Sequence, residues 1–221
     1  MAFLLQHTTV KRNPHNAGGI TPFLMACSRN KVGVVEVMLH DPAVDVVDGG
    51  RPGVSPFFAA CSEGNPRVVA ILAKDPRVDV NKPDRDGNTP FCVAARKGHA
   101  EVGALKHASV DAPGSDGTHA LFAQVLRLLL QDERVDPACC NKRGFTGLFL
   151  AAYHGNYSAM RVLLASDRID ANAQLDNGYS ALAVAAQESH VRVLKLLCET
   201  PGVDVNITTK NGATPLYVVV P

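Results

Sequence analysis

One period runs through this chain and constrains its fold more than any other feature. A Thr or Ser recurs with a Gly two residues before it and, in the first five copies, an Ala five residues after it. These residues are Thr21, Ser55, Thr89, Thr146, Ser180 and Thr214, separated by steps of 34, 34, 57, 34 and 34 residues. A repeat of this length is one supersecondary unit that buries its apolar face only by stacking on its neighbours. The period therefore predicts an elongated array of units.

Each unit carries the signals of a tight turn followed by two short helices. The Gly suits the turn because glycine takes positive φ freely. In Thr89-Pro90 the hydroxyl can cap a helix and Pro can occupy its first position. A first helix such as PFCVAARKG then ends at a Gly, and a second helix follows with an apolar face that includes Val68, Ile71 and Leu72. The predicted fold class is all-α, built from helix–turn–helix units.

The segments GNTPFCVAARKGHAEV and NGATPL resemble the ankyrin-repeat consensus, whose core is a Gly, one residue and then Thr-Pro-Leu. The resemblance covers nearly the whole chain in six copies. It implies an ankyrin-repeat solenoid with projecting finger loops, about five full repeats plus partial ends, used to recognise other proteins. One departure is the third position after the Thr, where the family usually has His. Here that position holds Leu24, Phe58, Cys92, Phe149, Ala183 and Tyr217.

The period divides the chain into a single domain, residues 1–221. Its parts are a partial unit 1–17, units 18–51, 52–85, 86–142, 143–176 and 177–210, and a partial unit 211–221. Solenoids need terminal units with polar outer faces. Neither end supplies one, so we expect either a longer array or ends that fray.

The third unit contains an insert, residues 102–124, that accounts for the step of 57 residues. Removing it joins Glu101 to Val125 and leaves GHAEVLRLLLQDERVD, a regular second helix. The insert starts with Val102 and ends with Gln124. Val codons begin with GT and one Gln codon is CAG, so its coding sequence can start with GT and end with AG, as introns do. A retained intron and a genuine insertion both remain open. If the insert is present, Thr118 can cap a helix with an apolar face through Leu121, Val125, Leu128 and Leu129, and the stretch HASVDAPGSDG is expected to form a loop.

The composition excludes several functional classes. The net charge of +1 argues against a general nucleic-acid binder. No apolar run approaches the roughly 18 residues of a membrane helix, so no membrane span is expected. The first residues lack the pattern of a secretory signal. Six cysteines without an export signal suggest free thiols in a reducing compartment, which predicts a cytoplasmic location and is compatible with the nucleus.

The chain offers little chemistry for catalysis or metal binding. No nucleophile elbow, phosphate-binding loop or zinc-protease motif is present, and no metal or cofactor is expected. Acidic residues recur with the period and are interpreted as turn residues; they are Asp45, Asp79, Asp136, Asp170 and Asp204. Cysteines on helices are expected to be buried and slow to react, namely Cys27, Cys61, Cys92 and Cys198. Cys139 and Cys140 lie in a turn and are expected to react faster.

The partner-binding residues are predicted from the resemblance, which implies contacts by the fingers and by the ends of the first helices. Carried onto this sequence, the site comprises Arg85, Asn88, Arg96, Lys97, Lys142, Arg143, Phe145, Tyr153, His154, Asn177, Tyr179 and Gln187. Aromatic and Arg side chains are enriched at interface hot spots. The repeat itself does not require aromatic residues at these positions.

The function predicted is a non-catalytic scaffold that binds another protein through a concave face and finger loops. The sequence does not identify the partner. Monomers or a longer array are expected. Two alternatives stay open: a recognition or targeting segment of a larger enzyme or signalling protein, and a basic patch that binds nucleic acid or anionic lipid headgroups.

Overall fold

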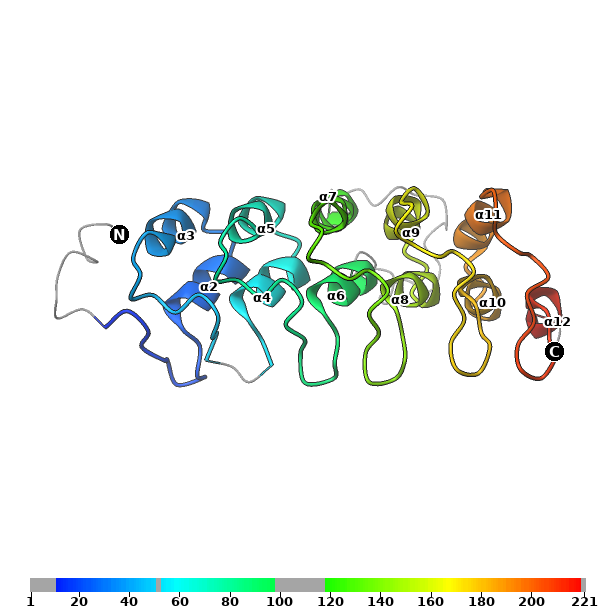
Figure 1. Ribbon diagram of the computed structural model, residues 1–221, viewed down its shortest axis with the longest axis horizontal. Coiled ribbons are helices and arrows are strands. Elements are labelled where there is room, and N and C mark those ends of the chain that lie inside the picture. Colours follow the sequence, from blue (N-terminus) through cyan, green and yellow to red (C-terminus); the bar gives the residue numbers. More distant parts are fainter. Residues whose placement is uncertain (1–10, 51–52, 98–117, 220–221) are drawn as a thin grey trace, which may run out of the picture.

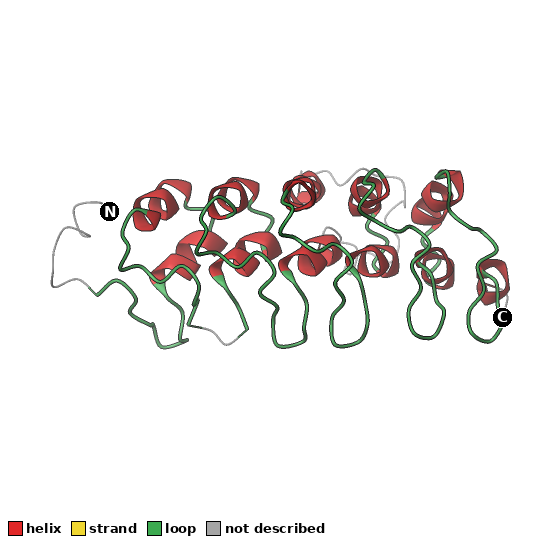
Figure 2. Ribbon diagram, in the orientation of Figure 1, coloured by secondary structure: helices red, strands yellow, loops and turns green. Residues whose placement is uncertain are grey.

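The computed structural model describes residues 11–50, 53–97 and 118–219, and it shows two rows of short helices with loops on one side (Figure 1). The first helices of the units are α2 (Pro22–Ser28), α4 (Pro56–Ser62), α6 (Pro90–Lys97), α8 (Gly147–Tyr153), α10 (Ala181–Gln187) and α12 (Pro215–Val219). The second helices are α3 (Val32–Leu39), α5 (Pro66–Leu72), α7 (Thr118–Gln131), α9 (Tyr157–Leu164) and α11 (Val191–Glu199). Figure 2 shows helices joined by loops and no strand in this part of the chain. The all-α solenoid is confirmed.

Each first helix begins where the sequence predicts. The hydroxyls of all six periodic Thr and Ser residues accept a hydrogen bond from the backbone N–H three residues later, at 3.0–3.3 Å. The Gly two residues before each of them has φ between 74° and 82°. Gly64 and Gly155 also have positive φ after their first helices. The cap and turn signals therefore determine the local structure of every unit, because their partners lie within a few residues.

The core is a stack of equivalent side chains. Phe23, Phe57 and Phe91 occupy the same place in successive units and are each 1 % exposed. At unit four the first helix starts with Gly147 in place of Pro, and a Cβ there would meet the Phe91 ring at 2.7 Å. Gly147 therefore lies directly against the aromatic ring of the preceding unit, with no space for a side chain between them.

Polar side chains also connect neighbouring units. Asn65 Nδ2 donates to the carbonyls of Cys27 and Ser28 at 2.9 Å, and Asn156 Nδ2 donates to that of Ala95 at 2.9 Å. His190 stands at the equivalent place in unit five, and its Nε2 lies 2.8 Å from the Tyr153 carbonyl oxygen. These carbonyls lie in the last turns of first helices, where the C=O groups have no i+4 partner within the helix.

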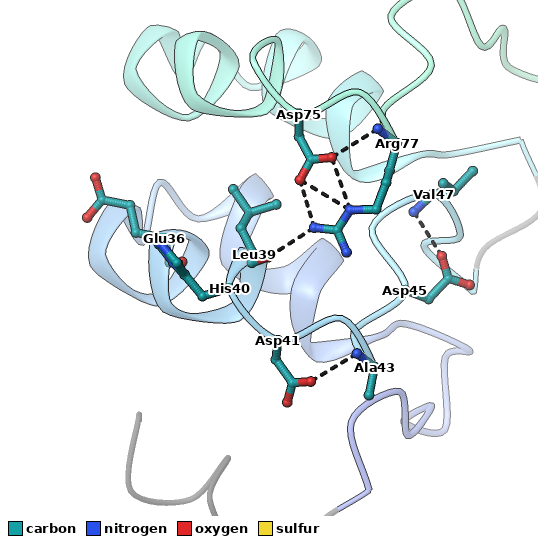
Figure 3. Close-up of polar contacts among 9 residues, drawn as sticks. All are labelled: Glu36, Leu39, His40, Asp41, Ala43, Asp45, Val47, Asp75 and Arg77. Atoms are coloured by element: carbon teal, nitrogen blue, oxygen red, sulfur yellow. Dashed lines mark hydrogen bonds and ion pairs between the residues drawn. The ribbon is translucent and has the colours of Figure 1, made fainter.

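A second connection is made by arginines of the inter-unit turns, and Figure 3 shows one of them, Arg77. Arg77 forms an ion pair with Asp75, with 2.7 Å between Nη2 and Oδ2, and donates to the Leu39 carbonyl at 3.0 Å. The hydrogen bond from Arg77 lowers the pKa of the Asp75 carboxyl. Equivalent arginines reach the preceding second helix: Arg134 donates to the Ala73 carbonyl and Arg168 to that of Leu130. A cation at the C-terminal end of a helix also interacts favourably with the helix dipole.

We expect Arg77→Ala to lower the free energy of unfolding by about 1 kcal/mol, because it removes a charged donor from the end of α3. Arg67→Ala is the matched control, since Arg67 lies exposed on α5. Urea denaturation followed by circular dichroism measures both. Equal stability of the two variants would show that the contact with Leu39 contributes nothing.

The second helix of unit three incorporates the end of the insert. α7 begins at Thr118, and the insert residues Phe122 and Ala123 are 9 % and 6 % exposed. The helix within the insert is as predicted, but its predicted apolar face is wrong at Leu121, which is 42 % exposed. The buried face runs instead through Phe122, Val125, Leu126 and Leu129. A Cβ at Gly64 would meet the Phe122 ring at 3.1 Å. The helix α7 therefore turns Phe122, and not Leu121, toward unit two.

Several predictions fall outside the described residues. They concern the beginning of the partial first unit, residues 1–10, and the remainder of the insert, residues 102–117. The predicted turn at Gly98 also falls there.

Candidate functional site

The candidate site is the surface formed by the finger loops and the first helices, called here the finger face. In each unit it is built by the residue before the periodic Thr or Ser and by the third, seventh and eighth residues after it. In unit four these positions hold Phe145, Phe149, Tyr153 and His154. The caps fix the starts of the first helices, so equivalent positions of successive units lie side by side along one row (Figure 1).

Unit four presents a continuous column of rings on this face. Phe145 and Phe149 stack with 4.7 Å between ring centroids, and Phe149 and Tyr153 stack at 6.3 Å. His154 meets the edge of Tyr153 at 5.1 Å. Tyr153 is 44 % exposed, whereas Phe149 is buried at 7 % and supports the rings on either side. The column offers an apolar surface with a phenol hydroxyl, a combination suited to an interface.

Phe149 belongs to the ring column of the finger face but was not among the predicted site residues. The sequence did contain a signal, because Phe149 and Tyr153 stand four residues apart on one helix. The interpretation of Phe149 as a packing residue in place of the family's His left it out of the site.

The other predicted site residues take different positions on the same face. Arg85, Lys142, Arg143, Asn177 and Gln187 are exposed, while Arg96, Lys97 and Tyr179 are partly buried. Among the described residues, the ring contacts of the column do not include Tyr179. The aromatic patch expected to span two units is therefore concentrated in unit four.

Asn88 is not available to a partner in this structure. Its side chain is 3 % exposed; its amide donates to Asp84 Oδ2 at 2.9 Å, and its Oδ1 accepts from Asn141 Nδ2 at 2.9 Å. Asn88 thus ties the finger of unit three to that of unit four. Sequence spacing placed it on the finger but could not show that the adjoining finger covers it.

The charge on this face is mixed. Lys97 forms an ion pair with Glu63 of the preceding unit, at 3.7 Å. Glu188 also lies close enough to His154 to affect its pKa. The basic centre expected from the sequence is thus partly balanced by acidic neighbours, which weakens the case for binding driven by phosphate.

His154 has a pKa below its ordinary value. The main cause is desolvation by burial, and the positive charges of Arg96 and His190 add to it, whereas Glu188 opposes it. The neutral form is therefore favoured in the folded state.

This pKa shift predicts a pH dependence of stability. Because the folded-state pKa is depressed, the contribution of His154 is present above the ordinary pKa and is lost as pH falls. We expect the stability difference between the parent and His154→Gln to shrink as the pH is lowered from 7 to 5. Thermal unfolding at several pH values measures it, with His40→Gln at the exposed end of α3 as the control. A difference that does not change with pH would contradict the prediction.

The finger face also contains a hollow between units one and two, with a volume of about 410 Å³. Its lining includes Ile20, Leu24, Val54, Phe58 and Ser62, which occupy the same places as the ring column does in unit four. Smaller side chains at equivalent positions leave a space, a result that depends on the volumes of residues from two units at once.

The cysteines divide into buried and accessible thiols. Cys27, Cys61 and Cys92 are buried as predicted, and burial raises the pKa of the Cys27 thiol to about 12. Cys139 is partly buried and Cys140 is exposed. The prediction for Cys198 is wrong, because it is exposed on α11. The buried face of that helix runs through Val193 and Leu197, and the next residue projects about 100° away from it.

No group of three or more His, Cys, Asp or Glu side chains in residues 11–50, 53–97 and 118–219 could hold a metal ion. Within the same ranges, no helix has the length and apolarity needed to cross a bilayer. The periodic acids act as turn residues: Asp79, for example, accepts from the Asn81 N–H at 2.9 Å, and Asp136 from that of Ala138 at 2.9 Å.

Comparison with known proteins identifies the repeat. The family model described as ankyrin repeats (3 copies) matches residues 23–112 and 117–209. The crystal structure of EF0377, an ankyrin repeat protein, superimposes with a TM-score of 0.69 at 21 % identity. That match covers 93 % of this chain and 92 % of the other, and at this identity it shows a shared fold. No curated protein matches the chain.

Proposed function

Because this chain belongs to the ankyrin-repeat family, whose repeats generally mediate protein–protein interactions, we propose that it binds another protein through its finger face. The observation that carries the proposal is the ring column of unit four. Tyr153 is exposed at 44 % although neighbouring rings hold it in place. A preorganised ring loses little conformational freedom on binding, which favours an anchor of high affinity.

The proposed contact extends along the row toward the fingers. Arg143 is exposed two residues before Phe145, so a partner that covers the rings would also meet a guanidinium at the edge of the contact. Apolar centres with polar rims are the usual anatomy of protein interfaces. The partner expected is therefore a protein segment with an apolar side chain for the rings and an acceptor for Arg143.

The family is generally non-catalytic, and we propose that this chain acts by binding alone. A role as the recognition segment of a larger enzyme or signalling protein is compatible with the same surface. Binding of nucleic acid or lipid headgroups has less support, because Lys97 is paired with Glu63 on this face.

The experiment is a quantitative capture of proteins from a cell lysate with three baits: the parent, Tyr153→Ala and Tyr157→Ala. Tyr157 is a matched control, since it lies on α9 in the second row of helices and stacks with the Arg192 guanidinium at 4.4 Å. We expect a protein retained by the parent and by Tyr157→Ala to be lost from Tyr153→Ala. Retention by all three baits, or loss from both variants, would contradict the proposed face.

A further inference from the structure

Two cysteines that are 47 positions apart meet at the junction of units three and four. Cys92 lies in the first turn of α6, and Cys139 lies in the turn that leads to the finger of unit four. The Cys92 thiol lies 3.7 Å from the Cys139 carbonyl oxygen, which places the two cysteines next to each other. The Thr89 hydroxyl lies 3.1 Å from the Cys139 sulfur.

The two thiols differ in access. Cys92 is 0 % exposed, whereas Cys139 is partly exposed to solvent. A small solute can therefore reach Cys139 but not Cys92. An accessible sulfur beside a buried one is the arrangement in which the first can be oxidised and the second can then replace the leaving group.

The surroundings also favour Cys139 as the nucleophile. The neighbouring Cys92 thiol lowers the pKa of Cys139 below that of an ordinary thiol, and the Thr89 hydroxyl adds to this effect. Burial and the negative charge of Asp136 oppose it. The pKa of Cys92 is raised, first by the same contact with Cys139 and then by burial. The thiolate, which is the reactive form, is thus concentrated on the accessible sulfur.

We propose that Cys92 and Cys139 are a modification site for hydrogen peroxide and form a reversible disulfide that joins α6 to the turn before the unit-four finger. The Cys139 thiolate attacks one peroxide oxygen and the O–O bond breaks. Hydroxide departs, and Cys139 becomes a sulfenic acid. The Cys92 sulfur then attacks the Cys139 sulfur, the S–O bond breaks, and the Cys92 proton departs with the hydroxide as water. The hydroxide released first takes up a proton, so two thiols are oxidised and one peroxide is reduced to two waters.

The bond would restrain the part of the finger face that carries the ring column. Cys140, next to Cys139, pairs with Thr146 in an isolated bridge at the base of the finger, and Phe145 precedes Thr146. A link from Cys139 to α6 therefore fixes the base of this finger against unit three. The thiol chemistry itself is independent of whether the proposed partner binding is correct.

The test treats the reduced full chain, at low protein concentration and neutral pH, with hydrogen peroxide, removes the peroxide, and then adds N-ethylmaleimide in urea so that the buried thiols also react. The chain has six cysteines, so we expect the oxidised monomer to take up two fewer maleimides than the reduced one. Tryptic digestion should yield a cross-link between residues 86–96 and 135–142, and dithiothreitol should reverse it. Cys140→Ser should keep the cross-link, and Cys139→Ser should lose it.

Two further measurements separate a native site from chance proximity. The same treatment in urea should abolish most of the cross-link, because the fold brings the two sulfurs together. In Cys92→Ala, alkylation of Cys139 by iodoacetamide should require a higher pH than in the parent, because the thiol that stabilises the thiolate is gone. A cross-link between Cys139 and Cys140, a cross-link between chains, or equal yield in urea would overturn the proposal.

Discussion

Phe122→Ala is expected to lower the free energy of unfolding by about 3 kcal/mol, the largest effect on stability predicted for a single side chain of this protein. The ring is 9 % exposed on α7 and packs against Gly64 of unit two. Truncation leaves a cavity that rigid neighbours cannot fill. Urea denaturation monitored by circular dichroism measures the change.

The adjacent Leu121 is the matched control, since it lies on the same turn of α7 and is 42 % exposed. Leu121→Ala should change the stability by less than about 0.5 kcal/mol. If both variants match the parent, α7 does not pack as described and the first residues of this helix contribute nothing to the stack.

The result also bears on the two origins considered for residues 102–124. Removing these residues joins Glu101 to Val125, which brings His99 to the position three residues before Val125 now held by Phe122. In unit five the equivalent residue is His190, which contacts the Tyr153 carbonyl at 2.8 Å. Both versions of the chain therefore have a side chain suited to that position. A large loss in Phe122→Ala would show that the longer chain uses its insert as part of the core.

The second large effect concerns binding. Once a partner has been captured, Phe145→Ala combined with Tyr153→Ala should weaken its affinity by at least about 2 kcal/mol, or roughly 30-fold. The two rings flank Phe149, so the double variant removes both ends of the column. Isothermal titration calorimetry measures the affinity.

The helical circular-dichroism signal of the double variant should equal that of the parent, because Phe149 and the Thr146 cap remain. Tyr157→Ala should bind as the parent does. An unchanged affinity in a folded double variant would show that the partner uses another surface, and the hollow at Ile20 and Phe58 would be the next to test.

The sequence by itself determined the repeat, the helix starts and the turns. Each of these depends on partners close along the chain: the Thr89 hydroxyl caps a backbone N–H three residues away, and Gly87 supplies positive φ for its own turn. Such local contacts form independently of how the units stack on one another. The exposure of Tyr153 also followed, because the repeat does not require an aromatic residue at the end of a first helix.

Only the tertiary structure decided the features that depend on how units stack. Arg77 and its acceptor Leu39 are 38 positions apart, and Cys92 and Cys139 are 47 apart, so neither pair follows from spacing within a unit. The burial of Asn88 and of Phe122 was decided in the same way, by an adjoining finger in one case and by Gly64 in the other. The period fixes which positions face a neighbouring unit, but the rotation of each helix and the volumes of the facing side chains decide which atoms meet.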